Sequence, residues 1–306
     1  MKKNTILAAS AVALIGLGLT GCSASADDSG ANADTASVTC PDGKIRFGIL
    51  PYEDPERLEP AYQTLAAALS EKLDCEVEVS ITEDYAAEVL AMENDQLEIA
   101  QFGPLGFVFA NQRADATAMV SFGDAEGKPT TYTGGIWVPK DSPVQTIEDL
   151  KGKTLALGSP GSTSGDALPM SALKDAGIDE DVTADYAGGH PEALLALVNG
   201  TVDAAQINSQ TLATATAEGT FDESEFRQIW KSEEIPNDPI TVRGNMPQEF
   251  KDAVSEALLS LDAADVEKVS GFLGVDPAGP LIPVTNETYK PLFDLAETMG
   301  LTEKDV

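Results

Sequence analysis

Apolar runs of strand length alternate with segments of helical periodicity from about residue 44 onward. The runs that predict strands are residues 44–50, 76–82, 97–102, 133–138, 153–157, 182–186, 202–207 and 226–230. Leu58, Leu65 and Leu69 keep the spacing of one buried helix face, and segments 247–260, 263–272 and 287–299 also read as helices. This alternation predicts an α/β fold with parallel strands in two blocks, with the last helices returning to the first block.

A stretch rich in glycine and hydroxyl residues, 158–165, follows one of these strands and precedes a helix predicted at 167–176. Ser162, Thr163 and Ser164 therefore lie where a helix begins, beside free backbone amides and the positive end of the helix dipole. Such residues form either an ordinary helix cap or an anion site, and the local sequence leaves both open. The stretch lacks the lysine of a Walker-type phosphate loop and the central serine of a nucleophile elbow.

His190 is the only histidine, and it occupies a similar place one strand–helix unit later. It follows two glycines and precedes Pro191, which predicts the N-cap of a helix. A lone histidine is often structural or exposed. In open α/β sheets, however, ligands bind at turns of this kind, so two helix N-termini are expected to converge on one small anion.

The N-terminus has the features of a secretory signal over residues 1–21. Two lysines precede an apolar run, 6–19, that is too short and wrongly flanked for a spanning helix. The ending Leu19-Thr20-Gly21-Cys22 resembles the bacterial lipobox, which implies cleavage before Cys22 and a lipid anchor on that residue. The alternative is a plain signal peptide that contains a cysteine. Residues 22–39 predict a flexible acidic tether because they offer almost nothing to bury.

Cys40 and Cys75 each stand just before a predicted strand. Strands joined by one helix tend to be parallel neighbours, so the starting ends of these two would lie within reach of a disulfide in an oxidising compartment. Two cysteines and one histidine are a poor zinc set, and we expect neither a metal nor a cofactor.

The chain is strongly acidic. Removing the predicted signal takes away Lys2 and Lys3 and no acidic residue, so 19 basic and 51 acidic residues become 17 and 51, a net charge of −34. This field disfavours nucleic acid and anionic lipid as partners. An anionic ligand would have to be held by local dipoles and donors against the same field.

Seven stretches together resemble the solute-binding proteins of phosphate, phosphite and phosphonate ABC transporters. They are residues 83–87, 99–104, 140–143, 162–165, 187–190, 199–205 and 235–240. The resemblance implies a two-lobed, type II periplasmic-binding-protein fold with the ligand in the cleft between lobes. Lobe I would comprise residues 40–132 and 239–306, and lobe II residues 133–238, with hinges near both crossings.

The same resemblance implies function and location. We expect no enzyme but a monomeric, extracytoplasmic binding protein, anchored to the outer face of the cell membrane, that delivers a small phosphorus oxyanion to a membrane permease. Its ligand contacts carry over residue by residue onto this sequence. They are Ser162, Thr163, Ser164, His190, Tyr85, Tyr132 and Asp238. None of these is Lys or Arg, so binding would rest on neutral donors, helix dipoles and a protonated His190.

Two positions depart from the family pattern. Gln101 stands where an aromatic residue is common, and Gln210 stands near the acid that holds the amine of aminophosphonates. The loss of that acid favours an amine-free ligand such as phosphite or methylphosphonate, with phosphate also possible. Three alternatives remain open: the same fold with a sulfonate or heterocycle, an exported hydrolase using Ser164 and His190, and a sensor that signals rather than delivers.

Overall fold

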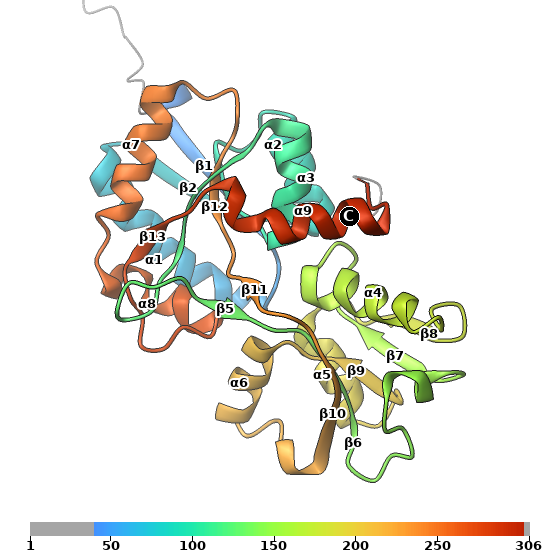
Figure 1. Cartoon of the computed structure of the whole chain (residues 1–306). Helices are drawn as coiled ribbons and strands as arrows, with labels where there is room; N and C mark the ends of the chain where they lie inside the picture. Colours follow the sequence, from blue (N-terminus) through green and yellow to red (C-terminus); the bar gives the residue numbers. More distant parts are fainter. Residues whose placement is uncertain (1–39, 303–306) are drawn as a thin grey trace, which may run out of the picture. The chain divides into compact units, whose positions relative to one another are not determined.

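The structure is a computed structural model that describes residues 40–302. The predicted signal sequence 1–21, the lipidation site Cys22 and the tether 22–39 lie outside the described residues. The described chain forms two sheets, each with its own helices, joined by a narrow two-stranded crossing (Figure 1). We call the six-stranded sheet with its helices the first lobe, and the five-stranded sheet with its helices the second lobe.

The first lobe is built on strands in the order β13-β4-β12-β3-β1-β2. Their bounds are β1 Lys44–Ile49, β2 Glu76–Ile81, β3 Ile99–Gln101, β4 Thr117–Phe122, β12 Ile240–Val242 and β13 Leu281–Pro283. β1 runs parallel to β2 and β3, but β12 and β13 pair antiparallel with their neighbours. The expectation of parallel strands is therefore wrong for this part of the sheet. The late strands return without a helical crossover, which only parallel pairing requires.

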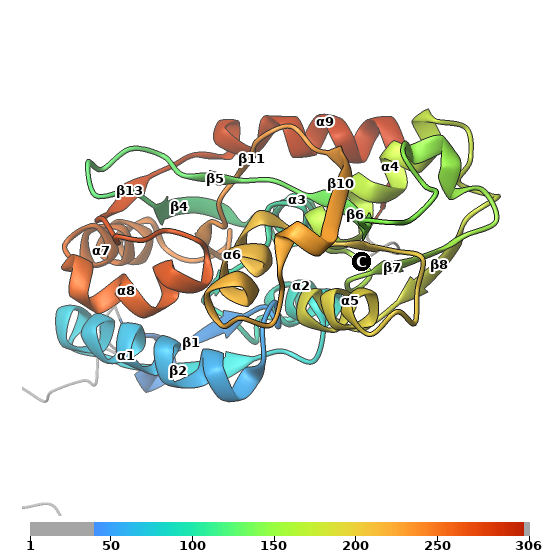
Figure 2. The same cartoon turned by 90° about the horizontal axis from the view of Figure 1, so that it is seen from below.

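Helices cover both faces of this sheet (Figure 2). They are α1 Pro55–Leu73, α2 Tyr85–Glu93, α3 Pro104–Ala114, α7 Gln248–Leu259, α8 Ala263–Phe272 and α9 Lys290–Met299. Ile45 and Phe47 on β1 belong to one apolar cluster with α1, α7 and α8, whereas Ala100 on β3 belongs to another with α2, α3 and α9. Ile99 and Ala100, successive residues of β3, thus face two different cores, and burial on both faces explains the apolar character of this central strand.

The second lobe repeats this scheme with strands in the order β10-β6-β9-β7-β8. The elements are β6 Gly135–Pro139, β7 Thr154–Leu157, α4 Leu168–Asp175, β8 Thr183–Tyr186, α5 His190–Val198, β9 Ala204–Gln206, α6 Ser209–Ala217 and β10 Phe226–Lys231. Leu155 and Leu157 share a cluster with Leu173 of α4, whereas Ala156 faces α5. Short 3-10 turns occupy Pro41–Gly43, Ile147–Leu150, Glu223–Glu225 and Asn286–Tyr289.

The chain passes between the lobes at β5, Thr131–Tyr132, and β11, Ile235–Pro236, which pair antiparallel (Figure 1). The strand predicted at 133–138 is interrupted here. The backbone amides of Thr133 and Gly134 donate to the hydroxyls of Ser209 and Ser232 instead of to a neighbouring strand. Lobe boundaries at 132/133 and 238/239 remain a prediction, with the crossing as their structural basis.

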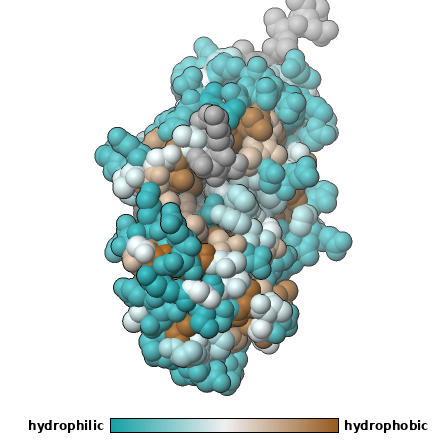
Figure 3. Space-filling model, turned by 90° about the vertical axis from the view of Figure 1, so that its right-hand side faces the viewer, coloured by the Kyte–Doolittle hydropathy of each residue, from teal (hydrophilic) through white to brown (hydrophobic). Residues whose placement is uncertain are grey.

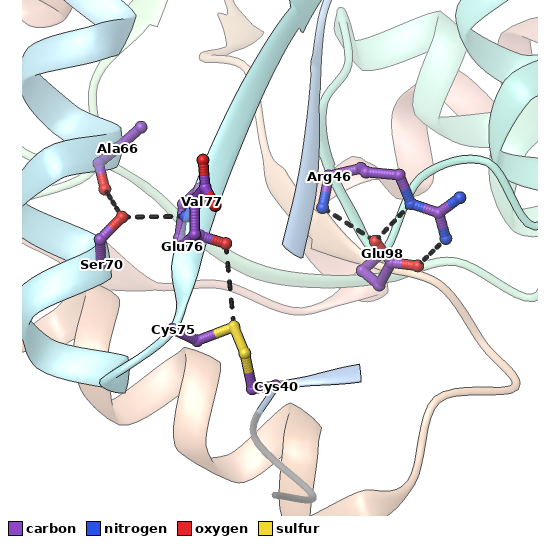
Figure 4. The surroundings of a disulfide bond; sticks show 8 residues. All are labelled: Cys40, Arg46, Ala66, Ser70, Cys75, Glu76, Val77 and Glu98. Atoms are coloured by element: carbon purple, nitrogen blue, oxygen red, sulfur yellow. Dashed lines mark hydrogen bonds and ion pairs between the residues drawn. A yellow bond between two sulfur atoms is a disulfide. The ribbon is translucent and has the colours of Figure 1, made fainter. Parts of the chain in front are cut away.

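Cys40 and Cys75 form a disulfide, as expected from the sequence (Figure 4). Their Cα atoms are 5.3 Å apart. Lys44 and Glu76 begin the parallel pairing of β1 with β2, so both cysteines precede the same end of neighbouring strands. The bond ties the start of the described chain to the loop after α1.

Hydrophilic residues cover most of the face of the molecule shown in Figure 3, and apolar residues appear there in separate small patches. None of the helices between residues 40 and 302 combines the length and apolar character needed to span a bilayer. Within the same residues, no group of three or more His, Cys, Asp and Glu side chains is arranged to hold a metal ion.

Candidate ligand-binding cavity

A small cavity lies between the two lobes. Seven of the nine ligand-binding residues expected from the sequence line it: Tyr85, Tyr132, Ser162, Thr163, His190, Gln210 and Asp238. The space inside it that the centre of a water molecule can occupy has a volume of about 20 Å³. One water needs roughly 10–15 Å³ on this measure, so the cavity has room for a group of only a few heavy atoms.

Helix N-termini surround this cavity. Tyr85 begins α2, Gly103 is the N-cap of α3, and His190 begins α5. Ser162 caps the turn that leads into α4, and Asn208 caps α6. Each terminus has unpaired amides and the positive end of a helix dipole, so five of them favour negative charge in the same small space.

The hydroxyl run begins in a π-helical turn, Thr163–Ala167, which precedes α4. The Ser162 hydroxyl accepts from the amide of Gly165 at 3.1 Å, so the residue is a helix cap and a lining residue at once. The Thr163 hydroxyl accepts from the amide of Leu105 at 2.9 Å, which joins this turn to the start of α3 in the first lobe. Ser164 does not line the cavity, but its hydroxyl lies 3.4 Å from the Asn208 amide nitrogen.

His190 reaches the same hydroxyl run from α5. Its Nε2 lies 3.3 Å from the Ser162 hydroxyl, so the expected meeting of these two turns is present. Gly189, not His190, is the N-cap; the helix begins one residue earlier than expected, because Gly189 holds the extended backbone of the cap. Burial lowers the pKa of His190 to about 4, although a hydrogen bond to Gln206 opposes the shift. The expectation of a protonated histidine is therefore wrong at neutral pH.

Asp238 provides a carboxyl group to the lining of the cavity. Burial raises its pKa to about 7, and a hydrogen bond from Gln101 at 3.4 Å partly offsets the rise. Gln101 does not line the cavity and is connected to it through Asp238. The turn itself is held by Asn237, whose carbonyl accepts from the hydroxyls of Ser121 and Tyr289. The Asp238 carboxyl is thus not what fixes the turn.

Tyr85 and Tyr132 bring two phenol groups to the cavity, with only 5% and 6% of their surfaces exposed. Burial raises the pKa of both, so they are neutral hydrogen-bond donors. Hydrogen bonds with Ser162 for Tyr85, and with Ser164 and Thr163 for Tyr132, oppose the rise. Both phenols therefore meet the hydroxyl run.

Gln210 lines the cavity, but its amide nitrogen is already engaged. This nitrogen donates to the side-chain oxygen of Asn237 at 2.8 Å and to the carbonyl of Leu273 at 3.0 Å. Because both protons of the amide are used, the side chain holds α6 to the end of α8 and has no free N–H for a ligand.

Sequence reasoning missed several cavity residues. Glu53, Asn208, Thr211 and Phe272 line it, and Gln206 forms a hydrogen bond with the His190 ring. Asn208 had a usable signal, because it follows a strand and precedes a helix as Ser162 and His190 do, but no glycine marks its turn. Glu53 had the same signal, because it lies between β1 and α1, whereas Phe272, at the end of α8, had none.

Among the described residues that line the cavity, none is Lys or Arg. The two lining residues with carboxyl groups are Glu53, whose side chain is 3.6 Å from the Arg57 guanidinium, and Asp238. Glu88 adds a third carboxyl nearby: it is 1% exposed, one of its oxygens has no hydrogen-bond partner, and burial followed by the charge of Asp238 raises its pKa. The cavity thus favours anions through dipoles and neutral donors alone.

Two lobes, each built on an α/β sheet, with a double crossing and a small polar cavity between them, define a type II periplasmic binding protein. The family described as "ABC transporter, phosphonate, periplasmic substrate-binding protein" matches residues 47–289, and the chain belongs to it. Members are binding components of transporters rather than enzymes, and they act outside the cytoplasm. The sequence-based prediction of fold and family is confirmed.

The relatives agree with this family. A phosphonates-binding periplasmic protein of Escherichia coli K12 is 29% identical over 274 residues, covering 85% of this chain and 81% of its own. A phosphate-import protein, PhnD, of Mycolicibacterium smegmatis is 25% identical over 317 residues, covering 95% of each chain. The solved structure of PhnD1 from Prochlorococcus marinus in complex with methylphosphonate has a TM-score of 0.73 at 19% identity, covering 86% and 99%.

Proposed function

We propose that this chain is a lipid-anchored binding protein that captures a small phosphorus oxyanion between its lobes and delivers it to the permease of an ABC importer. Phosphite and methylphosphonate are the preferred candidates, and phosphate or a related small phosphonate is also accommodated. The lobes meet around the ligand by a hinge motion at β5 and β11.

The observation that supports this function is the set of five helix N-termini around one small cavity without a lysine or arginine. Backbone amides, hydroxyls and phenols are all donors. A tetrahedral oxyanion has acceptor oxygens in every direction, so it can use donors that converge from several helices at once.

The size of the cavity favours the smaller members of this ligand class. The space open to the centre of a water molecule is about 20 Å³. A cavity of this size suits a phosphorus atom with its oxygens and one methyl group better than a ligand with a longer chain that ends in an amine. Gln210 carries no charge to balance an amine, and its amide nitrogen is engaged in holding the lobes. The names of the relatives, which include phosphonates and phosphate, point to the same ligand class.

The Asp238 carboxyl group favours a ligand that can share a proton with it. Two negative oxygens cannot approach each other without a hydrogen between them, so either the carboxyl or the ligand must carry one. Phosphite, phosphate and phosphonates can hold such a proton near neutral pH, and a sulfonate cannot. Above about pH 7, where Asp238 is ionised and the ligand must bring the proton, the carboxyl group therefore favours phosphorus over sulfur oxyanions.

The anchor rests on the sequence alone. The lipobox-like ending at Cys22 implies a lipidated N-terminus on the outer face of the membrane. Mass spectrometry of the mature chain is expected to find an N-terminal Cys22 with diacylglycerol, and an unmodified N-terminus at another residue would contradict this.

Replacement of His190 or Ser164 by alanine tests the binding site. We expect H190A and S164A each to weaken phosphite or methylphosphonate binding by roughly 10-fold to 100-fold, since each removes a buried hydrogen-bonding group. The rise in melting temperature that ligand causes in the wild type should shrink accordingly. S255A on α7 is the matched control and should bind as the wild type does. Wild-type affinity of H190A would point to a ligand held mainly by aromatic residues.

A further inference from the structure

The tautomer of His190 determines whether the cavity attracts or repels an anion at that side chain. A neutral imidazole has one N–H donor and one lone pair, on different nitrogens. His190 is buried, lines the cavity and is neutral at pH 7, because burial lowers its pKa to about 4. It therefore helps to bind an anion only if the proton sits on the nitrogen nearer the ligand.

The two ring nitrogens have different surroundings. Nε2 lies 3.3 Å from the Ser162 hydroxyl and 3.5 Å from the Asn208 side-chain nitrogen, and both of those residues line the cavity. Nδ1 faces away, 3.2 Å from the side-chain oxygen of Gln206. Gln206 ends β9 and is completely buried. In this arrangement Nδ1 carries the proton, and Nε2 presents a lone pair that Ser162 and Asn208 can satisfy.

The amide of Gln206 can reverse this polarity. Its nitrogen is buried without a hydrogen-bond partner, so the present orientation does not use its donors. The oxygen and nitrogen of a glutamine amide have almost the same size, and a half-turn exchanges them. After the half-turn the amide nitrogen donates to Nδ1, and the proton of the neutral ring belongs on Nε2. The half-turn leaves one unpaired amide atom, as the present orientation does.

We propose that Gln206 is a positioning residue that sets the tautomer of His190, donating to Nδ1 when an anion is bound so that Nε2 donates to a ligand oxygen. The inference rests on the proposed function, because it needs an anion in the cavity. The ring stays neutral throughout: one proton leaves Nδ1 for water, and one arrives on Nε2 from water. In the empty protein Ser162 and Asn208 take over as donors, and the amide returns.

Nuclear magnetic resonance of the histidine ring tests this directly, because His190 is the only histidine and its two nitrogen signals cannot be confused. The protein is labelled with ¹⁵N-histidine and measured at about pH 7, empty and saturated with phosphite or methylphosphonate. We expect the directly bonded proton on Nδ1 in the empty protein and on Nε2 in the complex. A proton that stays on Nδ1 in the complex, or protons on both nitrogens, would overturn the inference.

Substitution of Gln206 by methionine, Q206M, removes the amide with little change of shape. We expect binding about 10-fold weaker and no clean switch of the proton between nitrogens. Q145M, at an exposed glutamine of the second lobe, is the control and should behave as the wild type. If Q206M does not fold, the wild-type spectra still decide.

Failure of this inference differs from failure of the proposed function. If calorimetry shows that neither phosphite nor methylphosphonate binds, the function falls and the inference falls with it. If either ligand binds and His190 keeps its proton on Nδ1, only the role of Gln206 is refuted.

Discussion

Burial moves the pKa values of two cavity residues in opposite directions. It lowers that of His190 to about 4 and raises that of Asp238 to about 7, since both groups lose water that would solvate their charged forms. At pH 7 His190 therefore carries no positive charge, and Asp238 is only partly ionised. Neutral donors then determine which anion fits.

Asp238 makes the stability of the empty protein depend on pH. Its folded pKa of about 7 exceeds the ordinary value of 3.8, so the folded protein binds more protons than the unfolded chain between these values. Stability is highest below pH 4 with respect to this group and is lost as pH rises to about 7. One pKa unit corresponds to about 1.4 kcal/mol, so the loss amounts to a few kcal/mol.

The substitution D238N isolates this contribution. Apart from Glu88, whose pKa the charge of Asp238 also raises, the other carboxyl groups act alike in both proteins. The melting temperature of the empty wild type should therefore fall more steeply between pH 4 and pH 7 than that of D238N. At pH 8 the variant should be the more stable of the two. Parallel curves would mean that Asp238 is not protonated by burial.

At the scale of elements, the π-helical turn before α4 depends on a residue without a side chain. A Cβ at Gly165 would lie 2.8 Å from the Ser162 hydroxyl and 3.0 Å from Cε1 of His190. The glycine therefore allows the two turns that line the cavity to pack against each other.

We expect G165A to weaken ligand binding by at least 10-fold, because either Ser162 or His190 must move. Overpacking of this kind also costs roughly 1–3 kcal/mol of stability. The control is G271A on α8, where a Cβ meets nothing within 4 Å. That variant should keep wild-type affinity and gain up to about 1 kcal/mol. Titration calorimetry decides, and normal binding by G165A would show that the turn tolerates a wider separation.

Elements that have a clear local sequence pattern could be predicted from the sequence, and elements that depend on long-range pairing could not. β1 and β2 alternate polar and apolar residues over strand-length segments, and their parallel pairing follows from the single helix between them. β4, β12 and β13 were missed: β12 has three residues and joins β3 to β4 from far along the chain. Its place depends on long-range pairing rather than on local pattern.

The same limit applies to the cavity. Ser162 and His190 stand in glycine-rich turns after strands, and both were identified. Gln206 and Asn208 occupy equivalent strand ends without glycine, and they were not. Glu53 lies in such a turn as well, between β1 and α1, whereas Phe272, at the end of α8, has no local mark of a site.

At the scale of the whole molecule, contacts across the cleft close the cavity. Arg57 of α1 forms an ion pair with Glu218, at the end of α6, at 2.9 Å. The same guanidinium lies beside Glu53 and 5.3 Å from the ring centre of Phe272, and both of these residues line the cavity. Arg57 therefore contacts two residues that line the cavity and ties the second lobe to the first.

Removal of this contact should release ligand faster. We expect R57Q to raise the dissociation rate of phosphite or methylphosphonate a few-fold, because partly exposed pairs contribute roughly 0–1 kcal/mol. The difference from the wild type should shrink at high salt, which screens the pair. K151Q is the control, since Lys151 pairs with Asp181 at the surface of the second lobe. Stopped-flow traces that coincide for R57Q and the wild type at low salt would remove Arg57 from the closing contacts.

The central claim is that the cavity holds a small phosphorus oxyanion that carries no amine. The measurement that tests it most directly is titration calorimetry of the mature protein with phosphite, methylphosphonate, phosphate, 2-aminoethylphosphonate and an alkanesulfonate. We expect phosphite or methylphosphonate to bind with micromolar affinity or tighter, and the aminophosphonate and sulfonate at least about 100-fold more weakly. The absence of heat with every phosphorus oxyanion at millimolar concentration, or tightest binding of the sulfonate or aminophosphonate, would contradict the account.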